Sequence, residues 1–187
     1  MAPVVVYDAC VLFPAALRDL LMRVAVAGLV HARWSERILD ECFENIARQR
    51  PELSTASLGR TRQLMNLALE EPLVVGYEPL IETLKLPDPD DRHVLAAAIH
   101  ARAQTIVTWN LKDFPVAALS PHGVLALDPD EFVHDLVDLA PAGVVQVVAE
   151  QAAALRSPPH TLSQLLDKLH RNGLTRSVVR LRELAVP

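Results

Sequence analysis

The sequence predicts an α/β fold with a mostly parallel central sheet, followed by a helical C-terminal extension. Short aliphatic runs alternate with segments of helical periodicity as far as residue 127, the pattern of strands joined by crossover helices. From about residue 130 onward the apolar spacing is helical throughout. We therefore expect an α/β domain over residues 1–128 and a helical extension over residues 129–187.

The individual strands and helices are placed by their apolar patterns. Buried strands are expected where aliphatic residues run together, at residues 3–7, 30–34, 73–77, 105–108 and 124–127. Helices are expected where apolar residues recur every three or four positions, at residues 14–28, 36–48, 57–70 and 91–103 and in three segments of the extension. Pro14 suits the first turn of a helix, Gly28 suits its end, and Ser35 suits the N-cap of the next helix.

Composition indicates a globular protein of the cytoplasm. Of the 187 residues, 51% are hydrophobic and 22% are charged, a balance that favours a packed core over disorder. Cys10 and Cys42 give neither a disulfide framework nor zinc-ligand spacing, which favours a reducing compartment. The start of the chain lacks signal-peptide features, and no apolar run approaches the roughly 20 residues of a membrane span. We therefore expect no membrane association.

The net charge of −5 is unevenly distributed. Residues 63–155 carry 14 acidic and 4 basic side chains, whereas residues 156–187 carry 6 basic and 2 acidic ones. The acidic total argues mildly against a nucleic-acid binder, but an acidic middle flanked by more basic segments suits a metal site flanked by phosphate contacts. The chain has only six glycines and no glycine-rich phosphate loop, which argues against nucleotide-binding folds.

Acidic and amide side chains lie where an α/β fold places its functional site. Asp8 ends the first strand, and Asp113 follows a later strand, three residues after Asn110. Sites in open parallel sheets lie outside the carboxyl ends of the strands, so we expect these three side chains to lie together. Asp91 opens a helix, where the helix dipole favours a carboxylate, and Glu41 lies in the second predicted helix.

Carboxylates gathered in one pocket repel one another unless a cation neutralises them. Mg²⁺ and Mn²⁺ are hard ions that take carboxylate and water ligands, and they support phosphodiester hydrolysis. The pattern therefore predicts a Mg²⁺ or Mn²⁺ site. No nucleophile–base pattern and no HExxH spacing points to another chemistry, and Cys10 is interpreted as a small core residue rather than a nucleophile.

Four segments in order carry a resemblance to a known family. They are VVVYDACVL, SERILDE, DDRHVLAAA and IVTWNLKDFP, within residues 3–127. Each is common alone, but together, in their expected strand and helix contexts, they resemble the signature segments of PIN-domain nucleases. The segments ALRDLL and ARWSERILDE resemble a bacterial subfamily with a helical C-terminal extension. The resemblance implies a PIN-like, Rossmann-like three-layer fold with a Mg²⁺ site of three or four acids.

The resemblance assigns roles to individual acids. Asp8 matches the first family acid, Glu41 the second and Asp91 the third. Helical periodicity does not separate Glu41 from Asp40, so only the resemblance favours Glu41. Asp88, Asp90 and Asp91 form a local cluster, and one of the three is expected to be only an N-cap.

The fourth family acid has no direct counterpart. The family pattern puts an acid two residues after Thr108, where this chain has Asn110, and the nearest carboxylate is that of Asp113. Asp113 is therefore a candidate metal ligand, and Asn110 is a candidate for binding a metal-bound water or the substrate through its amide. The two roles are not exclusive. Thr108 is expected to assist by hydrogen bonding in the same pocket.

The resemblance implies an endoribonuclease in which a metal-activated water, held by the clustered carboxylates, cleaves RNA phosphodiesters. It also implies a VapC-like toxin of a type II toxin–antitoxin pair, with a cognate antitoxin and a homodimeric state. Two alternatives stay open. Asn110 in an acid position permits a catalytically degenerate PIN domain that only binds RNA or a protein. A receiver-like or phosphatase-like domain needs a lysine near an acceptor Asp, for which Lys112 is available, but the strand order and helical tail fit it poorly.

Further candidates are basic residues and one histidine. Residues 48–62 are expected to form a basic, irregular connection or a helical hairpin. Its four candidate arginines are either solvated surface charge, contacts to RNA phosphates or a surface for an acidic antitoxin segment: Arg48, Arg50, Arg60 and Arg62. The same alternatives apply in the extension to Arg171, Arg176, Arg180 and Arg182. His93 lies near the proposed site and could contact substrate, but a position on the helix surface is the favoured interpretation.

Overall fold

The computed structural model describes residues 2–156 and 158–185 and confirms the α/β class. Its central sheet is wholly parallel, with the strand order β2-β1-β3-β4. The strands are short and lie close to the expected positions: β1 (Val4–Tyr7), β2 (His31–Arg33), β3 (Thr105–Val107) and β4 (Leu125–Leu127). Parallel strands require crossover connections, which the helices between them provide.

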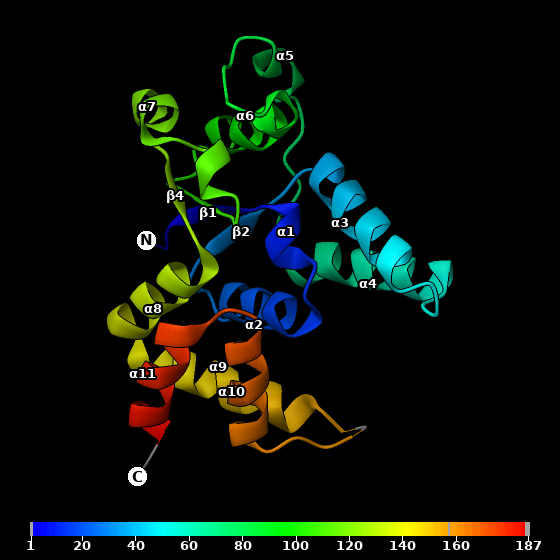
Figure 1. The fold of residues 1–187 in the computed structure, drawn as a ribbon, viewed down its shortest axis with the longest axis vertical. Helices are drawn as coiled ribbons and strands as arrows, with labels where there is room; N and C mark the ends of the chain where they lie inside the picture. The colour runs from blue at the N-terminus through cyan, green and yellow to red at the C-terminus, as the bar shows by residue number, and fades with distance from the viewer. Residues whose placement is uncertain (1, 157, 186–187) are drawn as a thin grey trace.

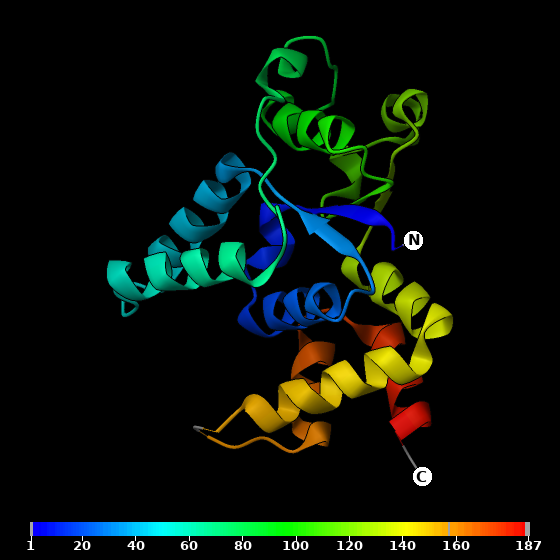
Figure 2. The ribbon, with the colours of Figure 1, turned by 180° about the vertical axis from the view of Figure 1, so that it is seen from behind.

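Helices cover both faces of the sheet (Figure 1). Those of the α/β part are α1 (Ala9–Leu12), α2 (Ala15–Val26), α3 (Glu36–Gln49), α4 (Thr55–Ala68), α5 (Glu78–Ile81), α6 (Arg92–His100) and α7 (Val116–Leu119). In both views α6 lies on one side of the sheet and α2 on the other (Figures 1 and 2). The layers are therefore helix, sheet and helix, as the sequence predicts.

The register of the sheet aligns the two strand ends that matter for function. Tyr7 at the end of β1 pairs with Val107 at the end of β3. Both residues are fully buried, so the central strands are fixed by the core. The residues that follow, Asp8 and Thr108, consequently leave the sheet side by side at its carboxyl edge.

The segment expected to be an irregular connection or a helical hairpin is a hairpin, formed by α3 and α4 (Figure 1). Ser35 caps α3, because its Oγ accepts a hydrogen bond from the backbone N–H of Ile38 at 3.2 Å. The buried side chains of α3 recur every three or four positions along one face: Ile38, Leu39, Cys42, Phe43 and Ile46. The hairpin presents the opposite face of α3 to solvent and to the edge of the sheet.

The strand expected at residues 73–77 is wrong. Only an isolated bridge forms there, between Leu73 and Trp34. Val75 is 69% exposed, and Gly76 takes a φ of +79°, which no extended strand contains. The apolar run LVVGY therefore makes one ladder contact and then turns away from the sheet.

The extension consists of α8 (Pro129–Leu139), α9 (Pro141–Ala154), α10 (Leu162–Arg171) and α11 (Thr175–Ala185). Helices α9 and α10 pack against α2 (Figure 2). Helix α8 packs against α9 and α11, and its Phe132 ring lies edge-to-face on Tyr7 of β1. The amide of Gln151 donates to the carbonyl of Ala16 at 2.9 Å and fixes α9 to α2. Buried Asp130 accepts hydrogen bonds from the backbone N–H groups of Arg176 and Ser177 and so fixes the start of α11 to α8.

No single helix among the described residues is long and apolar enough to cross a membrane. Only α8 and α9 taken together reach the necessary length and hydropathy, and they are bent by 120° at their junction.

Candidate active site

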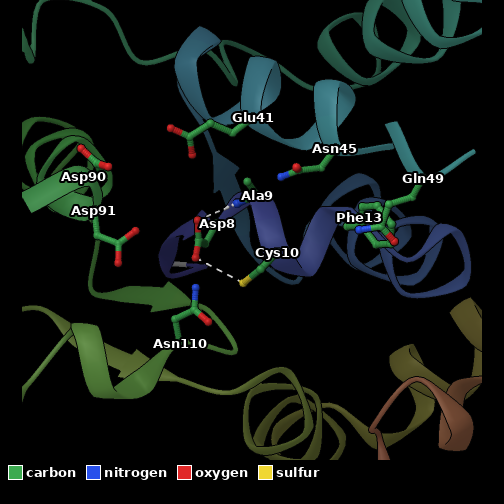
Figure 3. A pocket seen from close by; sticks show the side chains of 10 residues that line it. All are labelled: Asp8, Ala9, Cys10, Phe13, Glu41, Asn45, Gln49, Asp90, Asp91 and Asn110. Carbon is green, nitrogen blue, oxygen red and sulfur yellow. Dashed lines mark hydrogen bonds between the residues drawn. The ribbon is translucent and has the colours of Figure 1, made fainter. Parts of the chain in front are cut away.

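A pocket of about 520 Å³ opens at the carboxyl edge of the sheet, where β1 and β3 end (Figure 3). Four predicted site residues lie in its wall: Asp8, Glu41, Asp91 and Asn110. The other lining residues are Ala9, Cys10, Phe13, Asn45, Gln49 and Asp90. Figure 3 shows Glu41 above, Asp91 to the left and Asn110 below, with Asp8 in the middle of the group.

Asp8 is the most tightly held acid of the pocket. It is 4% exposed and serves as the N-cap of α1, with its Oδ1 accepting from the backbone N–H of Ala9 at 2.7 Å. The hydroxyl of Thr108 donates to its Oδ2 at 2.7 Å. Thr108 is itself fully buried, so the expected assisting role takes the form of a bond that fixes the Asp8 carboxylate.

Cys10 lies in the pocket wall and not in the core where the sequence suggests it. Its thiol donates to Asp8 Oδ2 at 3.2 Å and accepts from the backbone N–H of Trp109 at 3.3 Å. Burial and then the charge of Asp8 raise the pKa of the Cys10 thiol to about 12. A thiol with that pKa is protonated at neutral pH, which agrees with its interpretation as a structural group and not a nucleophile.

Glu41, and not Asp40, is the acid that α3 brings to the pocket. Asp40 turns outward and pairs with Arg62 at 2.6 Å. Glu41 Oε1 lies 3.0 Å from His93 Nε2 and 3.3 Å from Arg37 Nε. Partial burial by itself would raise the pKa of Glu41, but the bonds and charges of His93 and Arg37 together outweigh burial and lower it.

The expectation of a surface position for His93 is wrong. The side chain is 1% exposed, because every residue of α6 from His93 to Ala98 is buried. A helix that is covered all round offers no solvent face for its polar residues. His93 instead points its Nε2 at Glu41, while its Nδ1 has no hydrogen-bond partner among the described residues.

Asp91 ends the 3₁₀ turn η1 (Pro89–Asp91), directly before α6. Burial raises the pKa of Asp91 to about 6, and the charges of Asp8, Asp88 and Asp113 add to the rise. Asp88 is the N-cap expected in this segment, since its carboxylate accepts from the backbone N–H of Asp90 at 2.9 Å. Asp91 is thus the member of the cluster whose pKa is raised by the charges of other acids in and near the site.

The two candidates for the fourth position are separated by the structure. Asn110 lines the pocket, and its backbone N–H donates to Thr108 Oγ1 at 3.0 Å. Asp113 lies one 3₁₀ turn further on, in η2 (Leu111–Asp113), and is not among the lining residues. It is close enough to raise the pKa of Asp91 and so contributes charge to the site from outside its wall.

Sequence reasoning missed two polar lining residues, Asn45 and Gln49. Both lie on α3, four and eight residues after Glu41, so they share its face of the helix. The spacing of four and eight residues from Glu41 is the sequence pattern that could have predicted them. The two amides extend the pocket along α3 with uncharged donors and acceptors.

None of the four candidate arginines within residues 48–62 lines the pocket. Arg62 pairs with Glu36 and Asp40, and Arg50 pairs with Glu52. Arg48 and Arg60 are exposed and form no ion pair within residues 2–156 and 158–185. In the extension, Arg180 and Arg182 also pair with acids, at Glu183 and Asp167 respectively.

The donor set is compatible with a hard divalent cation, although it is open. Within the described part of the chain, no three His, Cys, Asp or Glu side chains are already gathered tightly enough to hold a metal ion. Mg²⁺ usually retains several waters and needs only one or two direct carboxylates, so an open group of acids suits it. Burial raises the pKa of Asp91 most, and a cation in the pocket would offset both this burial and the added repulsion from the other acids.

The parallel sheet and the acids at its carboxyl edge agree with the architecture of a PIN domain, and comparison with known families identifies the family. Residues 4–112 match the PIN domain family, and the chain belongs to that family. The matched range contains every residue that lines the pocket. Family membership decides against the receiver-like alternative that would have used Lys112.

The comparisons also characterise the extension and one relative. Residues 129–183 match the family described as the VapC50 C-terminal domain. Over 94 residues the chain is 45% identical to a protein of Mycobacterium tuberculosis (strain ATCC 25618 / H37Rv) described as "Putative ribonuclease VapC50". This alignment covers 50% of the chain and 55% of the relative, so the chain spans about half the length of the curated relative it matches. No solved structure matches the chain significantly.

Proposed function

We propose that this PIN-domain protein is a Mg²⁺- or Mn²⁺-dependent endoribonuclease and the toxin of a toxin–antitoxin pair. The observation that carries the proposal is the convergence of Asp8, Glu41 and Asp91 on one pocket at the carboxyl edge of a parallel sheet. The similarity of the chain to a protein described as a ribonuclease, and of its extension to the VapC50 C-terminal domain, supports RNA as the substrate.

In this proposal Asp8, Glu41 and Asp91 hold the cation, Asn110 offers a neutral oxygen donor, and Asp113 adds charge from outside the wall. A divalent cation at this place would lower the pKa of a water molecule and stabilise negative charge on the phosphodiester. The hydrogen bonds from Ala9 and Thr108 keep both oxygens of Asp8 in fixed positions. Such preorganisation avoids rearrangement when charge develops during cleavage.

The attacking group is a water molecule and not a side chain of the protein. Cys10 is the one thiol in the pocket wall, and its raised pKa keeps it protonated. Glu41, whose pKa is lowered, stays ionised at neutral pH and can accept hydrogen bonds or protons from water in the pocket. Cys10 therefore has a structural role, and Glu41 has a chemical one.

The substrate is single-stranded or looped RNA, because splayed strands can enter a narrow acidic site whereas a paired helix cannot. Asn45 and Gln49 lie along the α3 side of the pocket and would bind sugar or base atoms through their amides. A cognate antitoxin, a homodimeric state and a cytoplasmic location belong to the same proposal and rest on the family resemblance.

The direct test is the incubation of total cellular RNA with purified wild type and with the Asp8→Asn variant, each with Mg²⁺, Mn²⁺ or EDTA. We expect discrete products from wild type with a metal, none with EDTA and none from Asp8→Asn. Circular dichroism and thermal unfolding of both proteins serve as the control for folding. EDTA-resistant cleavage, or equal cleavage by Asp8→Asn, would contradict the proposal.

A binding module without catalysis is the second candidate, and Asn110 in the position of a family acid favours it. Cleavage separates the two candidates. If folded, antitoxin-free wild type cleaves no RNA under any of these conditions yet still binds RNA, the binding module is the better account.

A further inference from the structure

The extension makes one close contact with the loop that carries the active-site residues of β3. Trp109 lies in this loop between Thr108 and Asn110, and its indole ring packs against Gly173 in the turn between α10 and α11. A Cβ atom at position 173 would lie 2.6 Å from the Cη2 atom of Trp109 and 3.1 Å from its Cζ2 atom. Real Cβ atoms do not approach carbon atoms this closely, so only glycine fits here without displacing the ring.

The turn that holds Gly173 is well anchored. Its backbone N–H donates to the carbonyl of His170 at 2.9 Å, and that of Leu174 donates to the carbonyl of Leu169 at 3.1 Å. Leu174 is fully buried, and Gly173 has a φ of +98° that other residues rarely adopt. The extension as a whole is fixed to α2 through Gln151. The turn is therefore a firm surface against which the indole can rest.

On its other side Trp109 is joined to the site itself. Its backbone N–H donates to Cys10 Sγ, which in turn donates to Asp8 Oδ2. Its neighbours in sequence are Thr108, which bonds to Asp8, and Asn110, which lines the pocket. A movement of the indole would thus shift the backbone between two residues of the site.

We propose that the helical extension holds the active-site loop of residues 108–110 in place through the packing of Gly173 against Trp109. Trp109 and Gly173 are then positioning residues for RNA cleavage, an inference that rests on the proposed endoribonuclease function. The match of residues 129–183 to a named C-terminal domain assigns no role to that domain. The contact between Gly173 and Trp109 gives the C-terminal domain a role, which is to support a nuclease site built from a different part of the chain.

The test compares Gly173→Ala, Trp109→Leu, the double variant and a control, Gly28→Ala. Gly28 also has a positive φ, +73°, but nothing lies within 4 Å of a Cβ placed there. The control therefore reports the backbone strain of alanine without a steric clash. All variants are made in the full-length chain, and thermal unfolding checks that each one is folded.

Steady-state cleavage of an RNA fragment identified from the total-RNA digest is the first readout. We expect Gly173→Ala to lower kcat at least about tenfold with little change in KM, since a misplacement of about 1 Å is enough for such a loss. Gly28→Ala should stay within about twofold of wild type. Trp109→Leu should also lower kcat, and Gly173→Ala should add little to it because the clash is already gone. Independent, multiplicative effects of the two substitutions would overturn the inference.

The ¹⁹F NMR spectrum of 5-fluorotryptophan-labelled protein without metal or RNA is the second readout. The chain has two tryptophans, and Trp34 is fully buried elsewhere, so Trp109→Leu assigns both resonances. Gly173→Ala should move the Trp109 resonance and leave that of Trp34 in place, whereas Gly28→Ala should move neither. An unmoved Trp109 resonance would overturn the inference whether or not the protein cleaves RNA.

These readouts separate failure of the inference from failure of the proposed function. If wild type cleaves no RNA, the proposed function fails, and the resonance still reports whether the extension holds the loop. If Gly173→Ala does not fold, Trp109→Leu carries the test alone, because Trp109 is 37% exposed and its truncation is tolerable. Full kcat in folded Trp109→Leu would then overturn the inference.

Discussion

His93 Nε2 lies 3.0 Å from Glu41 Oε1, and this contact joins the first turn of α6 to the middle of α3. His93 is 1% exposed, yet its Nδ1 has no hydrogen-bond partner among the described residues. Burying an imidazole with one unpaired nitrogen costs stability, so the hydrogen bond to Glu41 is the visible reason for a histidine here.

Replacing His93 with leucine should therefore impair function more than stability. His93→Leu removes the bond to Glu41 and also the unpaired nitrogen, so we expect the free energy of unfolding to change by less than about 1 kcal/mol. Cleavage should fall by about tenfold, because Glu41 loses its buried partner and is no longer held in one orientation. Arg37→Gln is the matched control, since it removes the exposed partner of Glu41, and exposed pairs contribute little. Equal losses of cleavage in both variants would contradict this role for His93.

Asp91 should make the stability of the metal-free protein depend on pH. Its pKa rises from 3.8 to about 6 in the folded state, so the folded protein binds this proton more tightly than the unfolded chain does. This contribution to stability is fully present below about pH 4 and is lost as the pH rises through 6. Asp91→Asn should therefore raise Tm at pH 7.5 by roughly 2 °C, a modest value because solvent screens the half-exposed carboxyl group, and should change it little at pH 4.

Asp90→Asn serves as the control for this experiment, because Asp90 is an exposed neighbour in the same turn. Addition of Mg²⁺ should raise the Tm of wild type more than that of Asp91→Asn, since a bound cation stabilises the folded state. A lower Tm for Asp91→Asn than for wild type at pH 7.5 without metal would contradict the claim that the ionised Asp91 carboxylate destabilises the metal-free protein.

The fourth position of the site can be assigned by two substitutions. Asn110 lines the pocket and Asp113 does not, so Asn110→Ala should lower cleavage at least about tenfold and Asp113→Asn by less than about threefold. Asn110→Asp should tighten Mn²⁺ binding, because it adds a carboxylate to the pocket wall. The opposite ranking of Asn110→Ala and Asp113→Asn would make Asp113 the ligand.

The arginines near α3 should differ in their effect on RNA affinity. Arg48 has no ion pair within the described residues and directly precedes Gln49, which lines the pocket. Arg62, by contrast, is held by Glu36 and Asp40. In an Asp8→Asn background, Arg48→Gln should weaken RNA binding and lower the slope of log K against log salt by about 1. Arg62→Gln should leave that slope nearly unchanged. Fluorescence anisotropy at several salt concentrations measures both.

The sequence was sufficient to place the residues at the carboxyl edge of the sheet. A β-branched run that ends in Asp8 can only leave its carboxylate at a strand end, and the parallel order then brings Thr108 and Asn110 to the same edge. Local periodicity did not separate Asp40 from Glu41, because the two lie at similar angles from the apolar face. Asp40 is turned outward by Arg62, a residue of the next helix, and that ion pair is a tertiary contact.

The remaining differences also come from tertiary contacts. His93 begins a run of residues that are all buried, from His93 to Ala98. Periodicity within this run does not distinguish a buried face from an exposed one, so it could not predict the burial of His93. The aliphatic run at 73–77 has strand propensity, but the positive φ of Gly76 ends it after one bridge. The packing of Gly173 on Trp109 joins two separate parts of the chain, and no pattern within either part predicts it.

The central claim is that Asp8, Glu41 and Asp91 hold the cation that drives RNA cleavage. Electron paramagnetic resonance of Mn²⁺, titrated into wild type and into Asp8→Asn at neutral pH, tests it most directly because it needs no RNA substrate. We predict that wild type binds Mn²⁺ and that Asp8→Asn, folded to the same extent, binds it at least about tenfold more weakly. Equal Mn²⁺ affinity in the two proteins would contradict the claim and place any metal elsewhere.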